Sequence, residues 1–92
     1  MEVTIITGAS DGVGAETARQ LSARDGARAA LVLASRNAEK LQALATELEQ
    51  SGSQVLVVPT DVTDHIACIA LIEKTAAALG RIVTLIVNAG MS

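Results

Sequence analysis

The stretch that decides the fold is Val3-Thr4-Ile5-Ile6-Thr7-Gly8-Ala9-Ser10-Asp11-Gly12-Val13-Gly14. Its first five residues form a strand-like run, and the glycines that follow permit a sharp turn and a close approach to a ligand. A helix-like segment begins at about Gly12, so its unpaired N–H groups and the positive end of its dipole can receive an anion. The stretch therefore predicts a phosphate-binding turn in a parallel α/β sheet.

Size and composition exclude several classes of function. With 92 residues the chain makes at most one domain, and its net charge of −3 gives no general attraction to nucleic acid or to an anionic membrane. It has no aromatic residue on which bases could stack, and no apolar run approaches the roughly 20 residues of a membrane span. We expect neither nucleic acid nor membrane as a partner.

The cellular compartment is predicted from cysteine content and from the first residues. The one cysteine, Cys68, cannot form an internal disulfide, and Met1-Glu2 leads directly into a strand with no signal peptide. A cytoplasmic protein is expected.

Strand-like and helix-like segments alternate along the chain. We expect strands over 3–7, 29–35, 55–58 and 85–87, and helices over about 12–24, from 38 to about 51, and from 64 to 79. Asn37 should cap the second helix and Thr63 the third, while Gly26, Gly52 and Gly80 should close the three helices.

Helical spacing also predicts which side chains face the core. In the second helix the inward residues are Leu41, Leu44, Ala45 and Leu48. In the third helix they are expected to be Ile66, Ile69, Ile72, Ala76 and Leu79.

The order β-α-β-α-β-α-β, with continuously apolar strands, is typical of a parallel sheet buried on both faces. We predict an α/β, Rossmann-type three-layer sandwich with a four-stranded parallel sheet in the order 3-2-1-4. Three right-handed crossover helices would connect the strands, two on one face and one on the other. The glycine turn would then lie at the switch point between strands 1 and 4, where ligands bind in such sheets.

Four short motifs follow the four predicted strands. They are Thr7-Gly8-x-x-x-Gly12-x-Gly14, Ser35-Arg36, Asp61-Val62 and Asn88-Ala89-Gly90. In this order and spacing the chain resembles the short-chain dehydrogenases/reductases over essentially its whole length. It matches only the amino-terminal part of a typical member, so we expect residues 1–92 to be a single, truncated unit, the first half of a dinucleotide-binding domain.

The resemblance implies a cofactor role for individual residues. Gly8, Ser10, Gly12, Val13 and Gly14 correspond to the loop that holds the pyrophosphate. Asp61 corresponds to the carboxylate that meets the adenine amino group, with the Val62 backbone beside it. The motif Asn88, Ala89 and Gly90 corresponds to residues that flank the adenine ribose and stabilise the sheet centre. The alternative for Asp61 is a loop carboxylate favoured by the dipole of the third helix.

Cofactor choice depends on the end of the second strand. NAD enzymes usually place an acidic residue there to hold the ribose 2′-OH, and this chain has Ser35. Serine does not repel a 2′-phosphate, and Arg36 can bind one through charge-assisted hydrogen bonds. The sequence therefore favours NADP (NADPH) over NAD, although Arg36 could instead be a solvated charge. The acidic Asp11 near the phosphates opposes the preference.

Other residues depart from the family pattern or carry no predicted chemistry. Val87 stands where the family commonly has an asparagine, and Val83 where it often has an acid, so local hydrogen bonds at the site could differ. His65 is expected to be an exposed residue of the third helix and Cys68 a small residue on it. No metal site is predicted.

The family's chemistry requires a tyrosine and a lysine four residues apart and a serine on a later strand. The sequence contains no tyrosine, and Lys40 and Lys74 match no catalytic position. The resemblance implies the NADP(H)-binding portion of an oxidoreductase acting on carbonyls or secondary alcohols, with no catalytic residue and no catalysis by this chain alone. The alternative is a non-catalytic module that self-associates or senses NADP. We expect self-association through the exposed edge of the fourth strand or the uncovered sheet face.

Overall fold

The computed structural model describes residues 3–10 and 12–87. Its centre is a four-stranded parallel sheet in the order β3-β2-β1-β4, as predicted. The elements in chain order are β1 (Val3–Thr7), α1 (Gly12–Asp25), a 3-10 turn η1 (Gly26–Arg28), β2 (Ala30–Ser35), α2 (Ala38–Glu49), β3 (Gln54–Pro59), α3 (His65–Leu79) and β4 (Ile82–Ile86).

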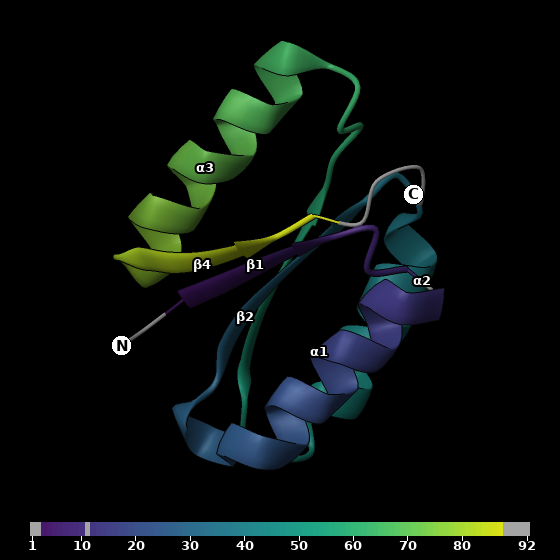
Figure 1. The fold of residues 1–92 in the computed structure, drawn as a ribbon, viewed down its shortest axis with the longest axis vertical. Coiled ribbons are helices and arrows are strands. Elements are labelled where there is room, and N and C mark those ends of the chain that lie inside the picture. The colour runs from purple at the N-terminus through teal and green to yellow at the C-terminus, as the bar shows by residue number, and fades with distance from the viewer. Residues whose placement is uncertain (1–2, 11, 88–92) are drawn as a thin grey trace.

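The helices form the two outer layers. α1 and α2 cover one face of the sheet, and α3 lies across the other (Figure 1). β2 is buried along its whole length, because Leu31 and Leu33 pack with α1 and α2 while Val32 packs on the α3 side. A strand with apolar neighbours on both faces explains the unbroken apolar run in the sequence.

The first two helices agree with the sequence prediction. α1 ends at Asp25, where Gly26 takes a φ of 53° that a side chain would disfavour. The side chain of Asn37 accepts a hydrogen bond from the Lys40 N–H at 3.0 Å and caps α2. The four predicted inward residues of α2 are all buried: Leu41, Leu44, Ala45 and Leu48.

The predicted inward face of α3 is wrong for most of its members. Ile66, Ile69 and Ile72 are 77%, 49% and 41% exposed, and Ala76 is also exposed. Leu71 and Thr75 are buried instead, while Leu79 packs partly against the core as expected. α3 is apolar on several sides, so the spacing of its apolar residues fits two different inward faces. On the face that is buried, the Thr75 hydroxyl donates to the Leu71 carbonyl at 2.8 Å, so its polar group is satisfied within the helix.

The cap of α3 and the bounds of two strands also differ from the prediction. Asp64, not Thr63, is the cap, because its carboxylate accepts from the N–H groups of Ile66 and Ala67 at 3.0 and 3.3 Å. β3 extends to include Pro59, whose missing N–H costs nothing on the outer edge. β4 starts at Ile82 and ends before Val87.

A buried hydroxyl pair joins the helices at the amino-terminal end of β3. The side-chain oxygens of Ser22 and Ser53 lie 2.7 Å apart, and the Ser53 hydroxyl is also 2.9 Å from the Gly26 carbonyl oxygen. The Ser22 hydroxyl is 3.4 Å from the Leu48 carbonyl oxygen. These bonds satisfy polar atoms that α1, α2 and β3 enclose together.

The observed orientation of α3 predicts unequal effects of two substitutions. Leu71→Ala should lower the free energy of unfolding by about 2–3 kcal/mol because it removes a buried side chain. Ile66→Ala should change it by less than about 0.5 kcal/mol because Ile66 is mostly exposed. Urea titration followed by circular dichroism measures both. If Ile66→Ala lowered the free energy of unfolding more than Leu71→Ala does, the inward face of α3 would be the one predicted from the sequence.

Candidate functional site

The carboxyl ends of the strands bring the predicted site residues to one edge of the sheet. The register pairs Thr7 of β1 with Ala34 of β2, and Ser35 of β2 with Pro59 of β3. The segments that leave these strands are therefore neighbours: the glycine turn, Ser35-Arg36 and Asp61-Val62. Parallel pairing makes this edge a single surface on which one ligand can contact all three segments.

The glycine turn has the backbone that its sequence predicts. Gly8 and Gly12 have φ values of 62° and 61°, in the left-handed region that favours glycine. The N–H of Ala9 donates to the carbonyl of Ala34 at 3.3 Å, which ties the turn to the end of β2. Ser10 is buried, whereas Val13, in the first turn of α1, is 69% exposed. The start of α1 thus faces solvent beside the turn, with N–H groups that have no partner within the helix.

Ser35 and Arg36 have different surroundings at the end of β2. Ser35 is buried, and its hydroxyl accepts a hydrogen bond from the Asn37 N–H at 3.1 Å. Arg36 is exposed and lines an open hollow of about 460 Å³ together with Asn37, Ala38 and Glu39. The charged side chain, rather than the serine, is therefore the group presented to a ligand here.

Asp61 is fixed in place by its own loop. One oxygen of its carboxylate accepts from the Thr63 hydroxyl at 2.6 Å and from the Thr63 N–H at 2.9 Å. The Thr60 N–H donates to the Ser35 carbonyl at 2.7 Å, so this loop starts beside the end of β2. The exposed Val62 follows.

These contacts lower the pKa of Asp61. The Thr63 hydroxyl has the largest effect, the Thr63 N–H comes next, and the positive charge of Arg36 acts in the same direction. The carboxylate is therefore ionised at neutral pH and has its second oxygen available as an acceptor.

Sequence reasoning missed the supporting residues of this edge. The sequence predicts Thr63 as a helix cap, yet in the structure Thr63 holds Asp61. The Asp61-x-Thr63 spacing, which is typical of an Asx turn, is the sequence signal for this contact. Asn88, Ala89 and Gly90, and also Asp11, lie outside the described residues.

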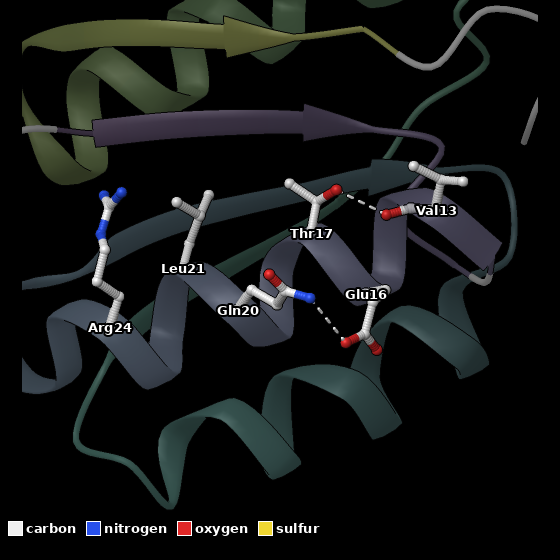
Figure 2. A pocket seen from close by; sticks show the side chains of 6 residues that line it. All are labelled: Val13, Glu16, Thr17, Gln20, Leu21 and Arg24. Atoms are coloured by element: carbon white, nitrogen blue, oxygen red, sulfur yellow. Dashed lines mark hydrogen bonds between the residues drawn. The ribbon is translucent and has the colours of Figure 1, made fainter.

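A larger hollow lies elsewhere, along the flank of α1. It has a volume of about 520 Å³, and Figure 2 shows that its walls come from one side of that helix. It is lined by Val13, Glu16, Thr17, Gln20, Leu21 and Arg24. Its polar groups already bond within α1, since the Thr17 hydroxyl donates to the Val13 carbonyl at 2.7 Å and the Gln20 amide to Glu16 at 3.3 Å. Only Val13 belongs to the predicted site.

The described residues contain neither a metal cluster nor a membrane-spanning helix. Within 3–10 and 12–87, no group of three His, Cys, Asp or Glu side chains could hold a metal ion. None of the helices in that part of the chain is long and apolar enough to cross a membrane.

Comparison with known proteins shows the family. The model of the short chain dehydrogenase family matches residues 2–92. The chain belongs to this family. A curated relative, cis-4-hydroxycyclohexanecarboxylate dehydrogenase of Sinomonas cyclohexanicum, is 39% identical over 90 residues, which make up 98% of this chain and 34% of the relative.

Solved structures of this family share the fold. The KRED1-Pglu enzyme superposes with a TM-score of 0.82 at 42% identity, covering 99% of this chain and 36% of that enzyme. An alcohol dehydrogenase of Thermococcus sibiricus, complexed with 5-hydroxy-NADP, gives 0.81 at 34% identity, covering 92% and 35%. The chain thus spans about a third of the length of these relatives.

The hydrogen bonds of Asp61 predict how its titration responds to mutation. In wild type the carboxyl should titrate below its ordinary pKa of about 3.9, and Thr63→Ala should raise the midpoint because the strongest hydrogen bond is lost. A carboxyl-carbon NMR titration measures both midpoints. Thr46→Ala is the control, since the Thr46 hydroxyl bonds to Gln42 in α2.

The same lowered pKa sets the direction of the pH effect on stability. The Asp61 carboxyl has a lower pKa in the folded chain than in the unfolded chain. Its contribution to stability is therefore complete above its pKa in the unfolded chain, and is lost as the pH falls through its pKa in the folded chain. An identical midpoint in wild type and Thr63→Ala would contradict the assigned cause.

Proposed function

We propose that the edge formed by the glycine turn, Arg36 and Asp61 binds the adenosine-phosphate part of a nicotinamide dinucleotide. The observation that carries this proposal is that three strand ends meet beside the start of α1, with glycines at positive φ in the turn. An anion there would meet backbone N–H groups and the positive end of the helix dipole. The Thermococcus sibiricus relative that is complexed with 5-hydroxy-NADP supports the same class of ligand.

Within this proposal the residues have distinct roles. Gly8, Ser10, Gly12, Val13 and Gly14 hold the pyrophosphate. Asp61 accepts a hydrogen bond from the adenine amino group beside the Val62 backbone, and the geometry that supports this is the fixed, ionised carboxylate. The remaining assignments are Asn88, Ala89 and Gly90, which flank the adenine ribose. Residues 1–92 are accordingly the nucleotide-binding part of a larger domain.

The 2′-phosphate of NADP is assigned to Arg36. This side chain is exposed at the mouth of the hollow that follows β2, and the buried Ser35 carries no negative charge that would repel a phosphate. Glu39 lines the same hollow and opposes a dianion there, so the preference of NADP over NAD depends on the arginine.

The cofactor preference is tested by calorimetry with two adenosine nucleotides. We expect 2′,5′-ADP to bind more tightly than 5′-ADP, and Arg36→Ala to weaken 2′,5′-ADP roughly tenfold because a charge-assisted hydrogen bond is lost. The same variant should change 5′-ADP binding little. Arg28→Ala, at the opposite end of the sheet, is the matched control. Absence of binding by either nucleotide would refute the nucleotide site itself.

The chain by itself is proposed to lack hydride-transfer activity. The proton transfer that accompanies hydride movement requires a positioned acid or base, and the tyrosine that the family uses for it is absent from these 92 residues. Mixing NADPH with a carbonyl substrate panel under single-turnover conditions should therefore show no oxidation above the buffer rate. Any protein-dependent turnover would overturn this expectation.

Self-association through β4 is a second proposal, favoured by the edge of the sheet. β4 is an outer strand, and its residues, Ile82 to Ile86, include no charge and no proline that would block pairing with another strand. Leu85 is 51% exposed. A second copy that adds its β4 to this edge would cover part of that side chain.

The association state can be tested with one charged substitution on each edge. The wild-type chain should sediment as a dimer at high micromolar concentration, and Leu85→Lys should shift it to monomer because charged edges resist strand pairing. Gln54→Lys, on the β3 edge, should leave the dimer intact. A monomeric wild-type chain would exclude the proposed interface.

A further inference from the structure

The outer strand β3, on the side of the sheet away from β4, carries a groove that the nucleotide site does not use. It has a volume of about 440 Å³ and lies between β3 and the second half of α3. Its lining residues are Leu56, Val57, Val58, Pro59, Lys74, Ala77 and Ala78. None of them is among the proposed nucleotide-binding residues.

The groove exists because small side chains face a strand that has no outer neighbour. β3 is the edge strand, so Leu56, which packs on the α3 side of the sheet, remains only half-buried. The facing positions of α3 are Ala77 and Ala78, which leave space that larger side chains would fill, while Leu71 makes the buried contact with the sheet. The lining of the groove is therefore apolar except for Lys74.

One positive charge lies on this apolar surface. Lys74 is the single charged residue of the lining, and among the described residues its ammonium has no ion pair. The positions one helical turn away are Ala70, Leu71, Ala77 and Ala78, none of which carries a charge. An occupant that matches the groove is thus apolar along its body and negative at one end.

We propose that the groove between β3 and α3 binds a medium-chain alkyl carboxylate, with its carboxylate at Lys74 and its chain along β3. The four consecutive lining residues of β3 span about 10 Å, at roughly 3.3 Å per residue, which suits a short extended alkyl chain. A volume of about 440 Å³ lies within the usual range for small-molecule sites.

Charge and backbone chemistry favour this ligand over two others. A phosphate group is normally held by several donors, whereas this groove offers one ammonium. An added peptide strand would pair with the outer N–H groups of β3, and Pro59 at the end of that strand supplies none, which shortens the edge available for pairing. A monoanionic carboxylate requires only the charge that is present.

The experiment uses octanoate and its uncharged analogue octanamide as probes of the 92-residue chain, with two-dimensional NMR as the readout. Octanoate should shift the amide signals of Val57, Ala77 and Ala78, and should bind roughly fivefold more tightly than octanamide, the size expected of one partly exposed ion pair. Lys74→Ala should remove that difference and Lys74→Arg should keep it. Ala77→Leu should weaken both probes because it fills the groove.

Matched controls make each outcome decisive. Lys40→Ala, on α2 across the sheet, should leave octanoate binding unchanged. A variant has kept the fold if its NMR spectrum matches the wild-type spectrum away from the substituted residue. Equal binding of the two probes, shifts confined to other elements, or full binding to Ala77→Leu would each overturn the proposal. If octanoate binding instead weakened as the protein concentration and the dimer fraction rose, the groove would be assigned to a second copy of the chain. Because the groove shares no residue with the nucleotide site, loss of nucleotide binding would not produce any of these results.

Discussion

The parallel pairing of β1 with a strand on each side is the constraint on which the rest of the molecule depends. β2 and β4 both run in the direction of β1, so each connection must cross a face of the sheet through a helix. The same direction puts the ends of β1, β2 and β3 at one edge, where the glycine turn, Arg36 and Asp61 become neighbours. Residues more than fifty positions apart in the chain form one surface because the strands are parallel, without any long loop to gather them.

The sequence predicted correctly those parts of the structure for which a local pattern is compatible with only one conformation or one buried face. A glycine at positive φ between a strand and a helix has few alternatives, and Gly8 and Gly12 adopt the expected backbone. The spacing of Leu41, Leu44 and Leu48 matches one helix face only, and that face is buried. The predicted Rossmann-type strand order is also confirmed, and with it the switch point between β1 and β4.

The errors arose where several solutions fit the same sequence. α3 has apolar residues around most of its circumference, so tertiary packing selected Leu71 and Thr75 over the isoleucines. Thr63 and Asp64 are both good caps, and the choice depended on Asp61, which accepts from the Thr63 hydroxyl and so engages that side chain. Such competition between neighbouring polar groups is decided by loop geometry. The shift of the β1–β4 register between Val3 and Thr4 likewise left no signature in strands built from apolar residues and threonine.

The buried hydroxyls of Ser22 and Ser53 join two distant parts of the sequence through a hydrogen bond. Each side chain is enclosed and serves as the hydrogen-bond partner of the other, across 31 positions of the chain. An apolar residue at one position alone would remove the bond between the two hydroxyls and leave the other serine with only its backbone carbonyl partner, whereas a matched apolar pair would remove both demands together. The two positions are therefore expected to vary as a unit among related sequences, and their coupling energy in a double-mutant cycle should be far from zero.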